Sequence, residues 1–341
     1  DGLVWKKKMF DQPIVSVVAT QSAQMGVVMT ADSLAIWDMT NGKIIEKISK
    51  QFFGKYGIVS ATIDRSKTKL IVSKGDPPSV TIMNIVDKKI DTVLSPKFPD
   101  AHYWDMYSEQ LSVYYKDNGY DFLAVVPTIY SPFSPNFAEL GVVFSVDLDS
   151  TNKYSFTNFQ DDIGRLTKEP IIFNNSKNVY ISSLRTYTQK KGYEPGYETI
   201  TQNSYDVYDL QTKKLVKKYD VPFYLITDDL QLLYGNNTLY NSKTKKVFRD
   251  TVMLPSERLQ KQVFFKDDAT LAGLCTDSTK GYALGIWDIL RRRWYKRYEG
   301  GIQSSLFFTE NKSYAVTGDV KGNVSLWKLP DSIGVDSLYV H

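Results

Sequence analysis

One phrase recurs along this chain. An alternating apolar strand ends in a large residue, an Asp, Asn or Lys follows, and a turn leads into a second strand. The clearest copy runs from Leu284 to Tyr298 around Trp287-Asp288. Repeated strand–turn–strand units of this kind predict a series of antiparallel sheets. Seven copies fit, with their large residues at Trp37, Met83, Val146, Tyr208, Tyr240, Trp287 and Trp327.

The spacing of these seven anchor residues sets the size of the repeat. The intervals are 46, 63, 62, 32, 47 and 40 residues, and four of them lie near the ~40–50 residues of a four-stranded propeller blade. The two longest intervals surround the third and fourth units, so the excess there must be inserted. We therefore expect an all-β fold, a seven-bladed β-propeller of four-stranded blades, with residues 1–341 as a single domain.

The repeat resembles the WD40 family of β-propellers over nearly the whole chain. The best matches are Trp37-Asp38, Trp287-Asp288 and Trp327-Lys328, and acidic residues of the family type stand at Asp32 and Asp319. The Gly-His pair of the family is missing, because the only histidines are His102 and His341. The usual His–Ser/Thr–Trp–Asp hydrogen-bond chain therefore cannot form in its standard version, and the resemblance is to a divergent propeller.

The two ends of the chain are complementary. Residues 1–10 read as a strand before any blade has started, whereas little strand-forming sequence follows Trp327. We expect the N-terminal strand to supply the outer strand of blade 7 and to close the ring, which removes an open sheet edge. The alternative is an independent N-terminal arm. Because the first residue is Asp1, we expect the domain to be part of a longer protein.

Composition argues against several classes of function. The formal net charge is only +4, from 42 basic and 38 acidic residues, so nucleic-acid binding is disfavoured. The single cysteine, Cys275, excludes an internal disulfide framework and a cysteine-based zinc site. No run approaches the ~20 apolar residues of a membrane helix. One short helical turn is the most that we expect, at residues 258–263.

No catalytic constellation stands out. The paired carboxylates at 161–162, 228–229 and 267–268 read as turns between first and second strands, and neighbours on a strand point to opposite faces. Two histidines leave little for a triad or a metal centre, and no Gly-rich phosphate loop is present. We expect no enzyme activity, no catalytic residues, no cofactor and no metal.

Three insertions carry the first candidate site. They span 95–108, 131–140 and 186–203, and WD40-like topology implies that all three open on one face over two adjacent blades. Aromatic residues are favoured at interface hot spots, and loops on rigid scaffolds often carry function. The alternative is that these loops bury their own rings; a small-molecule pocket is a third possibility. The aromatic cluster comprises Phe98, His102, Tyr103, Trp104, Phe133, Phe137, Tyr193 and Tyr197.

A basic patch in blade 6 is the second candidate. It contains Arg291, Arg292, Arg293 and Arg297 in a turn and an outer strand, and it could meet an acidic peptide, a phosphate or a nucleic acid. The alternative is an edge strand that charge protects against aggregation. Lysine pairs recur at comparable places in other blades, which favours this alternative.

The sequence therefore favours a non-enzymatic interaction platform of WD40-like type that binds a protein or peptide. The runner-up is a secreted or periplasmic propeller that binds or hydrolyses a small ligand or glycan. It is motivated by Asn-x-Ser/Thr sites at Asn174, Asn236, Asn311 and Asn323. We favour an intracellular location and leave a secreted one open. RNA or DNA binding through the basic patch is a third option.

Overall fold

The structure is a computed structural model of the chain, and its described residues are 2–20, 24–54, 58–64, 67–74, 79–94, 105–115, 121–130, 140–141, 144–148, 154–158, 171–174, 179–191, 198–209, 212, 214–221, 223, 225–227, 229–235, 238–249, 259–265, 270–275, 281–289, 291, 293–309 and 311–331. Between residues 105 and 204, and at a few other strand positions, only the backbone is described.

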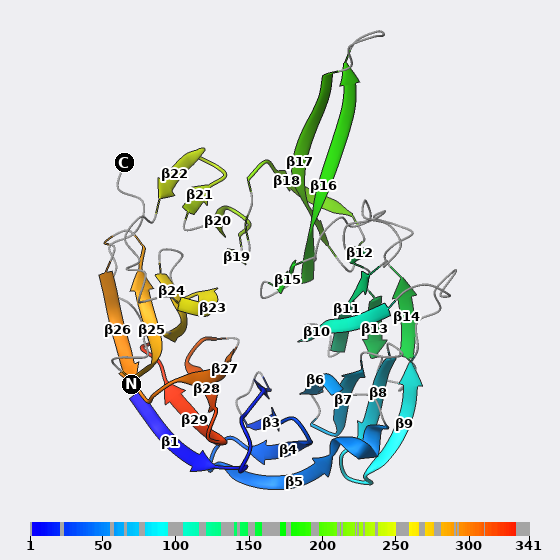
Figure 1. Cartoon of the computed structure of the whole chain (residues 1–341), viewed down its shortest axis with the longest axis vertical. Coiled ribbons are helices and arrows are strands. Elements are labelled where there is room, and N and C mark those ends of the chain that lie inside the picture. The colour runs from blue at the N-terminus through cyan, green and yellow to red at the C-terminus, as the bar shows by residue number, and fades with distance from the viewer. Residues whose placement is uncertain are drawn as a thin grey trace.

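The described chain is all-β, as the repeat predicts, and it forms antiparallel sheets whose strands follow one another in order. Figure 1 shows the sheets arranged around a common centre, with the first strand of each sheet facing inward. Sheet 1 contains β2 (Ser16–Ala19), β3 (Met25–Met29), β4 (Ser33–Asp38) and β5 (Lys43–Ser49). Sheet 2 contains β6 (Ile58–Ile63), β7 (Lys69–Lys74), β8 (Ser79–Asn84) and β9 (Lys89–Leu94).

Sheets 3 and 4 contain the longest strands. Sheet 3 comprises β10 (Asp105–Tyr115), β11 (Asp121–Tyr130), β13 (Phe144–Leu148) and β14 (Tyr154–Asn158), with the short β12 (Leu140–Gly141) paired to β11. Sheet 4 comprises β15 (Ile171–Asn174), β16 (Val179–Lys191), β17 (Glu198–Asp209) and β18 (Leu215–Tyr219).

Sheets 5 to 7 complete the described chain. Sheet 5 has β19 (Leu225–Ile226), β20 (Leu232–Gly235), β21 (Thr238–Asn241) and β22 (Lys246–Arg249). Sheet 6 has β23 (Leu259–Phe264), β24 (Thr270–Cys275), β25 (Tyr282–Asp288) and β26 (Arg293–Glu299). Sheet 7 has β27 (Gln303–Phe308), β28 (Tyr314–Asp319), β29 (Asn323–Lys328) and, as its outer strand, β1 (Gly2–Lys8).

Two local expectations need correction. Residues 258–263 do not form a helical turn, because Leu259 opens β23, which pairs with β24. The insertion expected at 95–108 is shorter than predicted, since β10 already begins at Asp105. Among the described residues, helical structure is limited to the 3₁₀ turn η1 (Lys50–Phe53), which buries Phe53 after β5. In both misassigned segments, pairing with a neighbouring strand outweighs local sequence preference.

Every anchor residue of the repeat lies on the third strand of a sheet, and the large anchors fill the space between neighbouring sheets. Trp37 lies in one apolar cluster with Val28 of sheet 1 and Val324 of sheet 7. Trp327 packs with Phe265 and Ala283 of sheet 6. Shared apolar clusters of this kind join sheet 4 to 5, 5 to 6, 6 to 7, 7 to 1 and 1 to 2. Burial of apolar side chains between sheets is therefore the main attraction that holds them together.

The Asp or Asn after an anchor holds the turn to the outer strand. Asp38 accepts hydrogen bonds from the Thr40 backbone and from the Asn41 side chain, both 2.8 Å long. Asn84 and Asn241 accept from backbone amides two and three residues on. Carboxylate and amide oxygens suit this role because they mimic a backbone acceptor in a turn. The "Asp" of the repeat is thus a turn residue.

Five of the seven described outer strands have a β-bulge opposite the anchor. In sheet 1 the register moves from Ile36↔Glu46 to Trp37↔Ile44, so Ile45 is skipped. Sheets 2, 4 and 6 have the same shift beside their anchors. Sheet 7 repeats it: Leu326 pairs with Trp5 and Trp327 with Leu3, so Val4 is skipped. β1 therefore takes the same geometry as the outer strands that follow directly on their own sheets.

The segment after β1 joins sheet 7 to sheet 1. The Met9 and Phe10 amides donate to the Gly322 carbonyl at 3.0 and 3.2 Å, and Trp5 Nε1 donates to the Met39 carbonyl at 3.1 Å. Gly322 has a φ of +83°, and a Cβ there would stand 2.0 Å from the Phe10 carbonyl oxygen. Only glycine fits this close approach of two backbones.

Candidate interaction surfaces

The predicted aromatic cluster lies outside the described residues. This holds for all eight of its members: Phe98, His102, Tyr103, Trp104, Phe133, Phe137, Tyr193 and Tyr197. What the structure describes is the backbone that flanks them. The insertion at 131–140 follows β11 and precedes β13, and the insertion at 186–203 connects β16 to β17. Each insertion therefore connects the second strand of a sheet to the third, in sheet 3 and in sheet 4 respectively.

The insertion in sheet 4 is a strand extension as much as a loop. β16 and β17 pair continuously from Tyr180↔Asp209 to Lys191↔Glu198. β15 pairs with β16 only as far as Ser182, and β18 pairs with β17 only from Tyr205 onward. Among the described strands, none pairs with either edge of the ribbon from Arg185↔Ser204 to its tip. Figure 1 shows this ribbon projecting far beyond the other sheets.

The sequence predicted an insertion at 186–203, and the structure shows β16 and β17 pairing along it from Thr186↔Asn203 to Lys191↔Glu198. The available signal was the alternation of Thr, Tyr and Ile with polar residues in 186–188 and 199–202, which are residue types enriched in strands. Unpaired strand edges expose rows of N–H and C=O groups that can bind an extended chain. A ribbon with two such edges is therefore a candidate docking element.

The basic patch is partly engaged with its own sheet. Arg291 Nη1 lies 2.9 Å from Asp288 Oδ2, so this guanidinium is tied to the anchor turn. The Arg297 guanidinium stacks over the Trp294 ring at 5.5 Å, and Arg293 is exposed on β26. Arg292 lies outside the described residues. The structure thus spreads the predicted patch along one outer strand and its turn.

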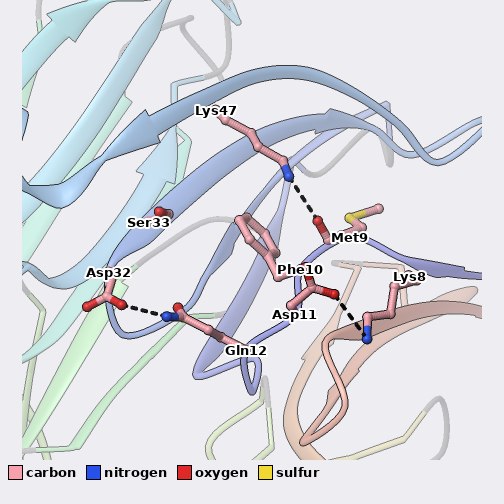
Figure 2. A pocket seen from close by; sticks show the side chains of 8 residues that line it. All are labelled: Lys8, Met9, Phe10, Asp11, Gln12, Asp32, Ser33 and Lys47. Carbon is pink, nitrogen blue, oxygen red and sulfur yellow. Dashed lines mark hydrogen bonds and ion pairs between the residues drawn. The ribbon is translucent and has the colours of Figure 1, made fainter.

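A shallow polar depression lies where the segment after β1 meets sheet 1 (Figure 2). Its charged groups are paired within it. Gln12 Nε2 donates to Asp32 Oδ2 at 2.5 Å, Lys8 Nζ lies 3.4 Å from Asp11 Oδ1, and Lys47 Nζ donates to the Met9 carbonyl at 3.2 Å. The Gln12–Asp32 and Lys47–Met9 hydrogen bonds fasten the N-terminal segment to sheet 1 and its β3–β4 turn, so the depression is a structural junction.

The described titratable groups with perturbed pKa values also serve the fold. Burial raises the pKa of Tyr298, which packs against Trp327 with ring centroids 5.9 Å apart. Burial lowers the pKa of Lys217, whose ammonium on sheet 4 donates to the Leu230 carbonyl and the Ser242 hydroxyl of sheet 5 at 2.9 and 3.0 Å. Asp229, from one of the paired carboxylates, caps its turn by accepting from the Thr227 hydroxyl and the Gln231 amide.

Within the described part of the chain, no group of three or more His, Cys, Asp or Glu residues could hold a metal ion. No helix of this part is long and apolar enough to cross a bilayer. No protein-family model matches the sequence, and no characterised protein matches it significantly.

Proposed function

We propose that the sheets are the blades of one closed, seven-bladed β-propeller of WD40-like type, with β1 as the outer strand of the last blade. Three observations support this. The described strands fall into sheets of the same order, apolar clusters join most consecutive sheets, and β1 at the start of the chain completes the sheet at its end. Circular closure of this kind leaves only short, protected sheet edges.

We further propose that this propeller is a non-enzymatic platform that binds a protein or peptide partner. The ribbon of β16 and β17 carries the proposal. Its outer part has no strand on either edge among the described residues, yet ordering each residue costs roughly 1–2 kcal/mol of conformational entropy. Such an element adds little to its own sheet, and it is suited to receive an extended partner.

Shortening the ribbon tests this function. Residues Arg185 to Ser204 are removed, and Leu184 is joined to Tyr205 by Asn-Gly, which suits a two-residue hairpin turn. We expect the melting temperature to change little, because the removed residue pairs support no other described strand. In pull-downs from native extract, we expect specific partners of the intact protein to be lost.

A matched control distinguishes the ribbon from the predicted aromatic cluster. With the ribbon kept at full length, Tyr193 and Tyr197 near its tip and Trp104 in the insertion at 95–108 are each changed to Ala. Loss of the same partners in both variants would assign recognition to the aromatic side chains, whereas loss in the shortened variant alone would assign it to the strand edges. Undiminished partner binding by a well-folded shortened variant would contradict a docking role for the ribbon.

The small-ligand alternative has less support. The polar depression of Figure 2 has its charges paired internally. Two of the Asn-x-Ser/Thr asparagines that motivated secretion hold turns: Asn323 donates to Asp319, and Asn311 accepts from the Ser313 amide. The absence of enzyme activity remains a prediction.

A further inference from the structure

The outer strands of the sheets differ from the rest of the chain in charge. The chain is nearly balanced, with a formal net charge of +4. Acidic residues on the outer strands are nevertheless confined to Glu46, Asp91 and Glu299. Six of the outer strands each carry exposed basic side chains, represented by Lys7, Lys43, Lys89, Lys218, Lys246 and Arg293.

These six strands belong to consecutive sheets. The apolar clusters that join sheet 4 to 5, 5 to 6, 6 to 7, 7 to 1 and 1 to 2 place β18, β22, β26, β1, β5 and β9 in one series. Figure 1 shows β22, β26, β1, β5 and β9 along the outer border of the molecule. The outer strand of sheet 3, β14, has no charged residue and interrupts the series.

The acidic residues on these strands do little to neutralise them. Glu46 Oε2 lies 2.9 Å from Lys88 Nζ, and Asp91 is bonded to Lys69 of β7. Both carboxylates are therefore occupied by lysines outside the outer strands. Lysines on an edge also deter edge-to-edge pairing, which by itself would explain scattered single charges. An unbroken series on six neighbouring strands, in which two of the three acids are already paired with other lysines, exceeds that requirement.

Apolar side chains are interleaved with these charges. Four of the five residues skipped at the bulges are apolar and exposed: Val4 by 50%, Ile45 by 50%, Val216 by 46% and Tyr295 by 43%. The fifth, on β9, is Asp91. Single-stranded nucleic acids are usually bound by basic grooves with aromatic rings on which bases stack. Here the interleaved residues are mostly aliphatic. That composition complements a peptide that alternates carboxylates with apolar side chains.

We propose that the outer strands from β18 to β9 form a cationic rim that binds an extended acidic segment of a partner protein, one in which Asp or Glu alternates with apolar residues. The flexible segment follows the curve of the rim, its carboxylates meet the lysines and Arg293, and its apolar side chains cover the bulge residues. This rim is separate from the ribbon of β16 and β17, so the proposal does not depend on the function assigned to that ribbon.

Binding of synthetic peptides to the whole protein tests the rim. An extended chain covers roughly 3.3–3.6 Å per residue, so peptides of about twenty residues span the outer strands of several sheets. Four fluorescent probes are compared in low salt: a Glu/Val peptide, a Glu/Ser peptide of equal charge, a Lys/Val peptide, and oligo-uridine RNA of equal charge. We expect the Glu/Val peptide to bind most tightly and its affinity to fall as salt is added.

A pair of double variants locates the site. Lys246→Gln/Arg293→Gln removes two rim charges on neighbouring sheets, whereas Lys321→Gln/Lys328→Gln removes two exposed charges elsewhere. Because an exposed ion pair is worth about 0.2–1 kcal/mol, we expect the rim variant to weaken the Glu/Val peptide about two- to tenfold and the control to change it less than about twofold. Equal losses would reduce the effect to net charge and overturn the rim.

The remaining outcomes are equally decisive. Tighter binding of the RNA than of the Glu/Val peptide would replace the proposed partner by a nucleic acid. Equal affinity of the Glu/Val and Glu/Ser peptides would remove the role of the bulge residues. If the Glu/Val peptide does not bind in low salt, the rim proposal is overturned, and the lysines serve only to protect the strand edges from pairing.

Discussion

Sheet 1 and sheet 7 have the same strand arrangement, but their outer strands come from different places in the chain. Each buries a tryptophan on its third strand, Trp37 at 0% exposure and Trp327 at 2%, and each has the same bulge in its outer strand. In sheet 1 the outer strand follows through a turn capped by Asp38. In sheet 7 the turn is missing, Lys328 replaces the Asp, and β1 arrives from the other end of the chain. Outer-strand geometry is therefore set by the strand it pairs with and not by the connecting turn.

The two sheets also differ in whether the indole N–H of the anchor tryptophan has a hydrogen-bond acceptor. Trp327 Nε1 donates to the Thr317 hydroxyl at 2.9 Å. Trp37 Nε1 is buried and has no partner, and Val28 occupies the position on β3 that corresponds to Thr317. A hydrogen bond from the anchor tryptophan to a hydroxyl on the second strand is thus present in sheet 7 and absent from sheet 1.

Removing residues 1–10 should cause the largest loss of stability, because these residues contact both sheet 7 and sheet 1. Sheet 7 would lose its outer strand, and Trp37 would lose Trp5, whose ring lies edge-on to it at 5.3 Å. We expect the whole domain to lose more than about 5 kcal/mol in one cooperative transition, since several buried contacts vanish together. Thermal denaturation followed by circular dichroism measures this. An unchanged melting temperature would show that β1 is an independent arm.

Replacing a single anchor tryptophan by alanine should reduce the free energy of unfolding by less than the removal of residues 1–10. We expect Trp37→Ala, Trp287→Ala and Trp327→Ala each to reduce the free energy of unfolding by about 3–5 kcal/mol, because each leaves a large cavity between two sheets. Chemical denaturation provides the values, with the exposed Val4→Ala as the control. Small losses at all three sites would mean that the anchors do not hold the sheets together.

Replacing the indole by a phenyl ring sharpens the difference between the two sheets. Trp327→Phe leaves the Thr317 hydroxyl without its donor, whereas Trp37→Phe removes an N–H group that already lacks a partner. We expect Trp327→Phe to cost about 1–3 kcal/mol more than Trp37→Phe, the cost of an unsatisfied buried polar group. Equal losses in chemical denaturation would mean that the hydrogen bond contributes nothing net.

Acid should weaken the β28–β29 turn of sheet 7 more than the β3–β4 turn of sheet 1, and this is the smallest effect of the series. The turn between β28 and β29 is held by Asp319, and the corresponding turn of sheet 1 is held by the neutral Thr30 hydroxyl. Burial raises the pKa of Asp319, but hydrogen bonds from Asn323 and Lys321 and the charge of Lys6 outweigh it, so the pKa is lowered from its usual 3.8.

The sign of the pH effect follows from that shift. A carboxyl whose folded pKa is depressed contributes stability that is present above the unfolded pKa and is lost as the pH falls through the folded pKa. We therefore expect Asp319→Asn to be less stable than the wild type at neutral pH, and the gap to narrow as the pH falls below about 4. A gap that stays constant with pH in denaturation experiments would contradict this.

Much of the fold could be predicted from the sequence because it depends on patterns that span only a few residues. Alternating apolar residues, a large anchor and a turn-forming Asp or Asn each act within a few residues, and they located the third strand of every sheet. The segment at 258–263 was misread because its structure depends on pairing with β24. The aromatic residues of the candidate site could be named from the sequence, and all of them lie outside the described residues.

By itself, the sequence determined the repeat and the all-β class, since strand and turn preferences are short-range. Only the tertiary structure decided the rest. The pairing of Leu3 with Trp327 joins the two ends of the chain, the bulge at Val4 reproduces that at Ile45, and the outer strands gather lysines from remote segments. The physical reason is that hydrogen-bond register and apolar burial couple residues hundreds of positions apart, and no local pattern records those partners.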